Sequence, residues 1–284
     1  LAHYFEHLMF KGTKNMAPGE FSRTVARNGG RDNAFTSQDY TGYVTTFAAD
    51  RLDLMLKLEA DRMTGLRLTP EDIAPERRVV LEERLSRIDN NPSAQLSEQA
   101  AAALYANHPY RIPIIGWEHE IKNLNRADLM EFYRAWYTPN NAVIVISGDV
   151  TAADVKPMVQ RHFGALPSRD LPTRPDWKEP PRSADRMVSL SHPRVRQPSW
   201  SRRYLVPNYG ASDRQQKYAL NVLTEILSGG TTGRFYRRLV VEQALAAHAG
   251  AWYSGDNRGP GVFGFYGSPR PGRTLDEIET AIEV

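Results

Sequence analysis

The sequence predicts an α+β protein, and two observations lead to that class. Segments with a helical spacing of apolar residues alternate with short segments that are rich in β-branched and aromatic residues. The same mixture occurs on both sides of residues 168–185, a proline-rich, charged segment without periodicity that suits a linker. We therefore expect two domains, residues 1–167 and 186–284, and a structural repeat would explain why they share this mixture.

The composition is that of an ordinary globular protein. Of 284 residues, 41% are hydrophobic and 24% are charged, and the formal net charge is +3. The arginines are scattered, so we expect no nucleic-acid partner. No apolar run approaches the roughly 18 residues that cross a bilayer, so we expect no membrane span. The lack of cysteine removes disulfides, cysteine–zinc sites and cysteine nucleophiles, but it leaves the cellular compartment open.

Periodicity divides residues 1–167 into several helices, a hairpin region and a buried strand. Pro18 and Pro70 suit the first turn of a helix. Residues 33–47 are rich in Thr, Tyr, Phe and Val and predict one strand or a hairpin. Residues 142–148 form a continuous apolar run that predicts a strand buried on both faces. The predicted helices are 1–10, 18–26, 50–63, 70–88, 94–105, 126–136 and 151–163.

The second half alternates in the same way. Its glycine-rich segment 229–234 lacks the phosphate-loop pattern and predicts a turn between two helices. The first residues open inside a motif and the last form an amphipathic stretch without a stop signal, so we expect truncation at both ends. The predicted strands are 187–190, 199–206, 247–254 and 261–268, and the predicted helices are 213–227, 233–241 and 275–284.

The first seven residues, LAHYFEH, contain a pattern that suits a metal site. His3 and His7 are four positions apart and share one face of a helix. Two imidazoles at this spacing can bind one zinc ion, and a nearby carboxylate that is not a ligand, here Glu6, can take a proton from the metal-bound water. The order H-x-x-E-H is the inverzincin signature. By itself this pattern is weak, and an exposed polar helix start is the alternative.

A third ligand has to come from elsewhere in the chain. Zinc bound by two histidines usually takes a carboxylate as well and leaves its fourth position to water. Glu76 and Glu83 are seven positions apart and lie two turns along one face of the predicted helix 70–88. Glu82 points about 100° away from Glu83 and is expected to face solvent or Arg78. Spacing alone does not bring Glu83 to the histidines.

Taken together, these residues resemble the pitrilysin family of zinc metallopeptidases, which includes the mitochondrial processing peptidases and bacterial two-domain members. The resemblance starts from His3-x-x-Glu6-His7 with Glu76 and Glu83, and it extends over nearly the whole chain. Further similar segments are Leu8-Met9-Phe10-Lys11-Gly12-Thr13, Asn33-Ala34-x-Thr36, His108-Pro109-Tyr110 with Gly116, Ser147-Gly148-Asp149, and 213–227 with Gly229-Gly230 and Gly233-Arg234.

The resemblance implies a fold and a set of site residues. It implies two similar domains, each a mainly antiparallel sheet with helices packed on one face, and places the metal in the first. It also implies that strands of the first domain are missing before residue 1. The ligands of one zinc ion would be His3, His7 and Glu83. Glu6 would be the general base that activates the zinc-bound water for attack on a peptide carbonyl, and Glu76 would support the ligands from outside.

The resemblance also implies where substrate is contacted. Asn33 and Ala34 would lie on an edge strand to which a peptide adds as a further strand. Arg234 and Tyr236 are candidates for substrate contact from the second domain. The remaining histidines are isolated, and His108, which precedes a proline in a loop, is expected to be structural.

The function implied is that of a zinc-dependent endopeptidase acting on peptides or unfolded protein segments. Because the family works as two halves that face each other, we expect a homo- or hetero-oligomer with a second family half. The alternative is a non-catalytic or partner-dependent subunit of such an assembly. Bacterial members of this kind are often exported, so we expect a periplasmic protein, with the cytoplasm as the other location.

Overall fold

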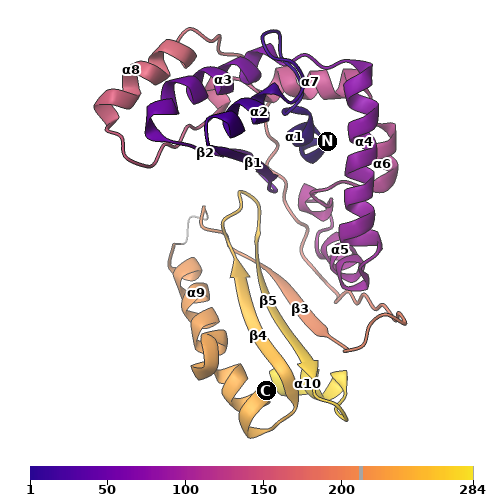
Figure 1. The fold of residues 1–284 in the computed structure, drawn as a ribbon. Coiled ribbons are helices and arrows are strands. Elements are labelled where there is room, and N and C mark those ends of the chain that lie inside the picture. The colour runs from indigo at the N-terminus through magenta and orange to yellow at the C-terminus, as the bar shows by residue number, and fades with distance from the viewer. Residues whose placement is uncertain (211–213, 284) are drawn as a thin grey trace. The chain divides into compact units, whose positions relative to one another are not determined.

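The computed structural model describes residues 1–210 and 214–283, and these form two compact units. The first unit contains Leu1–Arg87 and Pro113–Asp176, and the second contains Ile88–Ile112 and Trp177–Val284. Each unit combines helices with an antiparallel sheet, as Figure 1 shows, and this confirms the predicted α+β class. No helix in the described ranges is both long and apolar enough to cross a membrane.

The first unit is mostly helical, and its helices occur close to the predicted positions, except for the helix at 118–123, which was not predicted. The long helix 70–88 is observed as α4, which continues into a π-helical turn, η2 (Leu85–Asp89). The α-helices of this unit are α1 (Ala2–Leu8), α2 (Glu20–Arg27), α3 (Leu52–Gly65), α4 (Pro70–Arg84), α6 (Glu118–Asn123), α7 (Arg126–Trp136) and α8 (Ala152–Phe163). Short 3₁₀ turns are η1 (Ala49–Arg51) and η4 (Pro139–Asn141).

The predicted strand or hairpin at 33–47 is a hairpin. Strands β1 (Arg31–Thr36) and β2 (Thr41–Thr46) pair in antiparallel register, from Arg31 opposite Thr46 to Thr36 opposite Thr41. The backbone N–H of Ser37 donates to the carbonyl of Tyr40 and closes the turn. The alternating burial along β1 turns Ala34 and Thr36 toward the protein and leaves Asn33 exposed.

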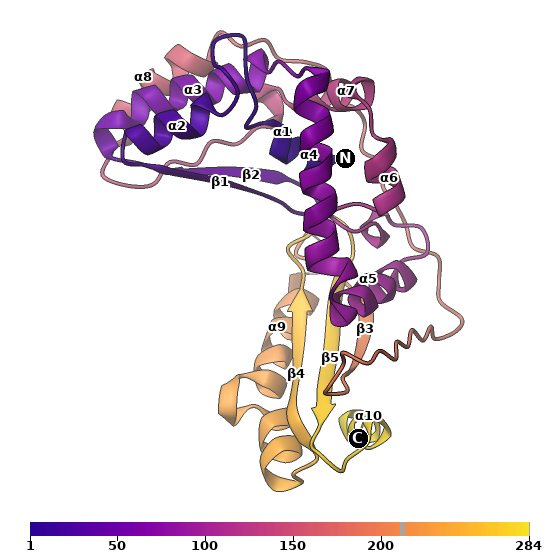
Figure 2. The same ribbon diagram turned by 45° about the vertical axis from the view of Figure 1, so that its right-hand side comes forward.

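Helix α1 forms the centre of the largest core in the first unit. Tyr4, Phe5 and Leu8 are fully buried, and they pack with apolar residues of α4 and α7. Figure 2 shows α1 beside α4. The core partners from the other helices are Ile73, Val80, Leu129 and Tyr133. This packing fixes the rotation of α1 about its axis, and with it the direction of the polar side chains between the core residues.

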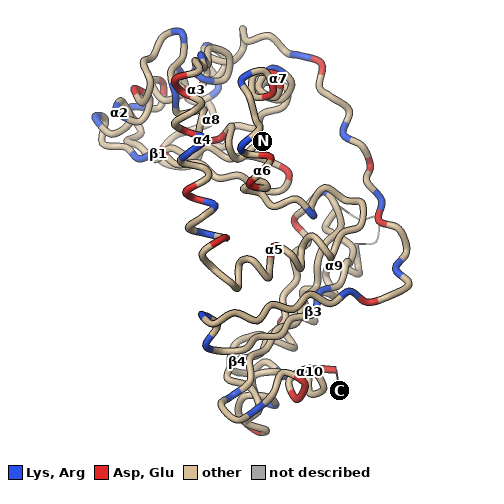
Figure 3. The backbone as a smooth tube through the Cα atoms, turned by 90° about the vertical axis from the view of Figure 1, so that its right-hand side faces the viewer, with Lys and Arg blue, Asp and Glu red and all other residues tan. Residues whose placement is uncertain are grey.

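The start of α4 is fixed by local capping. Thr69 and Asp72 form a capping box, and Pro70 occupies the first turn as predicted. Acidic and basic residues alternate along the rest of the helix (Figure 3). The N-terminal boundary of α4 therefore follows from the sequence. This boundary fixes the positions along the helix axis of the glutamates farther along α4.

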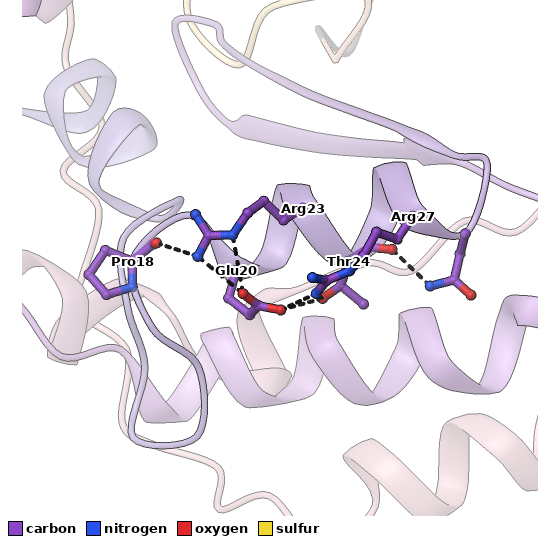
Figure 4. Close-up of polar contacts among 6 residues, drawn as sticks. Pro18, Glu20, Arg23, Thr24 and Arg27 are labelled. Atoms are coloured by element: carbon purple, nitrogen blue, oxygen red, sulfur yellow. Dashed lines mark hydrogen bonds and ion pairs between the residues drawn. The ribbon is translucent and has the colours of Figure 1, made fainter.

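Helix α2 shows how a single acidic residue can organise the polar face of a helix. Glu20, in the first turn, accepts hydrogen bonds from Arg23, Thr24 and Arg27 (Figure 4). The N-cap is Gly19 at φ 72°, a left-handed conformation that glycine adopts without a steric cost. The negative charge at the helix N-terminus also complements the helix dipole.

The predicted strand at 142–148 is wrong. These residues are in no strand, and Val143 and Val145 are 89% and 84% exposed. A strand exists only through hydrogen bonds to a neighbour, and no described segment pairs with this run. The predicted strand at 187–190 is wrong for the same reason, and Met187 is exposed.

The second unit is built on a three-stranded antiparallel sheet. Its strands are β3 (Trp200–Val206), β4 (Ala246–Ser254) and β5 (Gly261–Pro269), in the order β3-β5-β4. Its helices are α5 (Pro92–Leu104), α9 (Arg214–Ser228) and α10 (Leu275–Glu283), with the π-helix η6 (Tyr236–Glu242) and the 3₁₀ turns η3 (Pro109–Arg111) and η5 (Gly230–Thr232). The predicted start of α9, Asp213, lies outside the described residues.

Helices cover both faces of this sheet, which differs from the predicted one-sided packing. Phe263 packs with buried residues of η6 and α10, including Leu239 and Ile278. Val262, the preceding residue of β5, points to the other face of the sheet and packs against α5 and η3. The difference arises because α5 and the segment after it have apolar residues to bury. These are Leu104 at the end of α5, Tyr105 next to it, and Tyr110 in η3.

Candidate metal centre

Helix α1 presents its two histidines and its glutamate around one end of the first core. The rings of His3 and His7 lie edge to face, with centroids 4.9 Å apart, because the four-residue spacing places them on successive turns. His3 and Glu6 are buried, and His7 is half-buried. The predicted placement of both histidines on one helix face is therefore confirmed.

Helix α4 brings its two glutamates to the same place. Oε2 of Glu83 lies 3.3 Å from Nε2 of His7 and 3.6 Å from Nε2 of His3. Two turns earlier on α4, Oε1 of Glu76 lies 2.9 Å from Nδ1 of His7. Val80 lies between the two glutamates in the sequence and is fully buried, so the core contact of α4 turns both carboxylates toward α1.

The three side chains form a donor set that fits a metal ion. One ligand atom from each of His3, His7 and Glu83 can be chosen so that all lie within 4.8 Å of one another. Two imidazole nitrogens and a carboxylate oxygen are ligands that zinc accepts, and such a set leaves a further position open. Glu82, the neighbour of Glu83, is exposed.

The electrostatics of the two imidazoles differ because their partners differ. Burial lowers the pKa of His3 to about 4, against the opposing effect of Glu83. The pKa of His7 is raised, first of all by its hydrogen bond with Glu76, despite the desolvation that comes with burial. A neutral imidazole is the form that can bind a metal, so the burial of His3 favours the ligating state.

Glu76 is held by two cationic or proton-donating groups. Its Oε2 lies 2.6 Å from Nζ of Lys11, and its Oε1 contacts His7. Burial would raise the pKa of the Glu76 carboxyl, but the hydrogen bonds from His7 and Lys11 outweigh it, and the pKa lies below its ordinary value. Glu76 is thus ionised and accepts from Nδ1 of His7, which leaves Nε2 of His7 facing Glu83.

Two residues for which the sequence predicts no individual role lie at this centre. Thr36 Oγ1 donates to Oε2 of Glu6 over 2.5 Å. Arg87 places a guanidinium nitrogen 2.8 Å from Oε1 of Glu83, one turn along the helix. Thr36 belongs to the quoted segment Asn33-Ala34-x-Thr36, and Arg87 has the i+4 spacing to Glu83, so both carried a signal in the sequence.

The predicted substrate-contact residues fall into different units. Asn33 and Ala34 lie on β1, opposite Val44 and Tyr43, and Oδ1 of Asn33 accepts from the backbone N–H of Ala34. Arg234 and Tyr236 lie in the second unit, where both are exposed; Tyr236 is the first residue of η6 and Arg234 lies two positions before it.

Family comparisons cover both units. Residues 1–118 match the model described as insulinase (peptidase family M16), and residues 123–283 match the model described as the peptidase M16 inactive domain. The first match ends and the second begins within α6, so their boundary differs from that between the two compact units.

Individual relatives of the chain are named zinc proteases. The chain is 35% identical to the zinc protease PqqE of Helicobacter pylori over 88% of this chain and 56% of that protein. It is 28% identical to an uncharacterized zinc protease of Mycobacterium leprae over 100% of this chain and 63% of the relative. The chain therefore spans a little over half the length of these curated relatives.

Solved structures share the fold. The crystal structure of a protease from Helicobacter pylori superposes with a TM-score of 0.89 at 32% identity, over 99% of this chain and 67% of that one. The crystal structure of pitrilysin superposes with a TM-score of 0.72 at 19% identity, over 95% of this chain and 29% of that one, which is a likeness of fold.

Proposed function

Because this chain belongs to peptidase family M16, we propose that it is a zinc-dependent endopeptidase that hydrolyses peptides or unfolded protein segments. The single observation that carries the proposal is the convergence of His3, His7 and Glu83 from two helices, with Glu6 beside them. Relatives named zinc proteases support the choice of zinc over other divalent ions.

In this proposal His3, His7 and Glu83 hold one zinc ion. Glu76 accepts the Nδ1–H of His7, and this fixes the tautomer whose Nε2 is free to bind a metal. When bound, zinc supplies a Lewis acid that polarises a carbonyl and acidifies water. Lys11 forms an ion pair with the Glu76 carboxylate, so the negative charge of Glu76 is not left unpaired in a partly buried site.

Glu6 is the general base. It projects from the same helix as the two histidines, it is buried, and it has no cationic partner in the part of the chain that the structure describes. A carboxylate without an ion pair is able to take a proton from the attacking water and give it to the leaving amine.

The substrate peptide adds to the β1 edge as an extended strand. β1 pairs with β2 on one side only within the described residues, so its second edge can offer main-chain hydrogen bonds near Asn33 and Ala34. Arg234 and Tyr236, both exposed, are proposed to contact substrate from the second unit. Backbone pairing reads little of the side-chain sequence, which suits unfolded segments of varied composition.

The test combines metal analysis with peptide cleavage. We expect the purified protein to contain about one zinc ion per chain, to cleave a quenched fluorescent peptide, and to lose that cleavage with a chelator. Glu6→Gln should keep the zinc and lose the activity. Glu83→Ala should lose zinc, whereas its exposed neighbour variant Glu82→Ala should keep it. Cleavage by Glu6→Gln at the wild-type rate would show that the assignment is wrong.

A partner-dependent subunit is the second candidate. The family resemblance implies an assembly in which a second family half closes the site, and the match of residues 123–283 to a domain described as inactive supports this candidate. That half is either another copy of this chain or a metal-free relative. Light scattering, with activity measured across a dilution series, tests this: a homo-oligomer loses activity on dilution, and a single active monomer does not.

We also propose a periplasmic location and two structurally related domains at 1–167 and 186–284, as the family resemblance predicts. Cell fractionation with an antibody against the protein tests the location. Recovery in the cytoplasmic fraction alone would contradict it.

A further inference from the structure

The Glu6 carboxylate has one side-chain hydrogen-bond partner among the described residues, and that partner comes from the β1–β2 hairpin. Thr36 Oγ1 donates to Oε2 of Glu6 over 2.5 Å, inside a buried environment. We propose that Thr36 is a positioning residue that fixes the orientation of Glu6. This inference rests on the proposed function, because Glu6 needs an orientation only if it acts on a reacting group.

The carboxylate at the end of a glutamate side chain needs a partner to fix its orientation. The last torsion of glutamate is broad and roughly two-fold, so its carboxylate rotates freely without a partner. A general base has to lie within hydrogen-bond reach of the proton that it takes. The bond from Thr36 occupies Oε2, and Oε1 has no side-chain partner in the described chain, so one oxygen is held and the other is available.

The donor is itself held in place. Thr36 and Thr41 are opposite each other on the last pair of the hairpin ladder, and their hydroxyl oxygens lie 3.4 Å apart. Because Thr36 gives its proton to the carboxylate, Thr41 must be the donor in the contact between the two hydroxyls. The β-branched side chain of threonine also restricts its first torsion, which limits the positions that the hydroxyl can take.

The hairpin that carries Thr36 is tied to the helix that carries Glu6. The hydroxyl oxygen of Tyr43, on β2, lies 2.7 Å from that of Tyr137. The ring centroids of Tyr137 and Phe5 are 4.9 Å apart. Phe5 precedes Glu6 in α1 and is fully buried. The distance between the Thr36 hydroxyl and the Glu6 carboxylate is therefore set by core packing and not only by the hydrogen bond between them.

Three single substitutions in the full chain separate this role from a general role in folding. Thr36→Val removes the hydroxyl and keeps the shape, and Thr36→Ser keeps the hydroxyl. Thr46→Val is the matched control, because Thr46 lies on the same hairpin and is exposed. For each variant we would measure kcat and KM on a quenched peptide, zinc content, and the crystal structure around Glu6.

We expect Thr36→Val to lower kcat by about 10- to 100-fold, the range found for residues that orient a reacting site, with KM and zinc content unchanged. Thr36→Ser should restore most of the rate, and Thr46→Val should match the wild type. The crystal structure of Thr36→Val should show the Glu6 carboxylate in a new orientation.

Several outcomes would overturn the inference. It fails if Thr36→Val keeps the wild-type kcat while Glu6→Gln is inactive, a result that leaves the proposed peptidase function intact. It also fails if Thr36→Ser is as slow as Thr36→Val, or if Thr46→Val is equally slow. If the wild type does not cleave peptides, the proposed function fails, and the crystal structures then decide: an unmoved Glu6 carboxylate in Thr36→Val overturns the positioning role.

Discussion

Nδ1 of His7 lies 2.9 Å from Oε1 of Glu76. This contact links α1 to α4 through a glutamate that is not one of the candidate metal ligands. The bond assigns the proton of the imidazole to Nδ1 and leaves Nε2 directed toward Glu83, 3.3 Å away. In the proposed site Glu76 would act on the metal through the orientation of a ligand, which is the supporting role that the family resemblance implies for it.

Replacement of Glu76 tests this role. We expect Glu76→Ala to weaken zinc binding by about 10- to 100-fold, because His7 loses the acceptor that fixes its tautomer and ring. Glu76→Gln keeps an acceptor oxygen and should weaken binding less. Competition with a chromophoric chelator measures the affinity. Glu82→Ala is the control, and an equal loss of affinity in that exposed variant would mean that the effect is not specific to the His7 contact.

Zinc should stabilise the first unit. A ligand that binds the folded state alone adds about 2.7 kcal/mol to the free energy of unfolding at a concentration of 100 times Kd. We expect chelation to lower the melting temperature of the wild type. In His3→Ala, which lacks one ligand, the melting temperature should be the same with and without chelator. Differential scanning calorimetry measures both proteins, and a zinc-dependent shift that persists in His3→Ala would exclude His3 as a ligand.

The site was predictable from the sequence to the extent that it depends on helical spacing. The positions of His3 and His7, and of Glu76 and Glu83, follow from one repeating geometry, and the structure places each pair on one face. That α1 and α4 meet is a matter of tertiary packing, and only the family resemblance, which the matches confirm, supplied it. Thr36 was quoted as part of a motif, but its contact with Glu6 depends on how the hairpin folds over α1.

The strands show where sequence reasoning fails. Thr-, Tyr- and Val-rich residues at 31–46 and β-branched residues at 142–148 both favour extended backbone. The first segment becomes a hairpin because it brings its own partner across a short turn. The second has no partner in the described chain and forms no strand. Composition indicates that a segment can be a strand, whereas a sheet depends on which segments meet.

Adjacent valines of α4 provide a matched test of the first core. Val80 is fully buried between Glu76 and Glu83, whereas Val79 is 49% exposed. We expect Val80→Ala to lower the free energy of unfolding by about 2 kcal/mol, from lost burial and the cavity left behind. Val79→Ala should change it by less than about 0.5 kcal/mol. Urea unfolding followed by tryptophan fluorescence measures both, and equal effects would mean that α4 presents a different face to the core.

Glu179 gives the linker a defined attachment within the second unit. Its carboxylate oxygens accept from the backbone N–H groups of Ala106 and Asn107, at 2.7 and 2.9 Å, and also from that of His108. Burial would raise the pKa of the Glu179 carboxyl, but these three hydrogen bonds outweigh it, and the pKa lies below its ordinary value. Consecutive N–H groups form an anion-binding nest, so the ionised form is the one that is bound.

The sign of the pH dependence follows from that direction. A carboxyl whose pKa is lower in the folded state stabilises the protein above the unfolded value and loses this contribution as pH falls through the folded value. We expect Glu179→Gln to lower the free energy of unfolding at pH 7 by about 1 kcal/mol, because the site is partly exposed. The difference from wild type should shrink on acidification below pH 4.5, the ordinary value for glutamate. Urea unfolding at several pH values measures this. Asp185→Asn, an exposed linker variant, should match the wild type throughout, and a Glu179→Gln deficit that stays constant with pH would show that the nest does not bind the charged form.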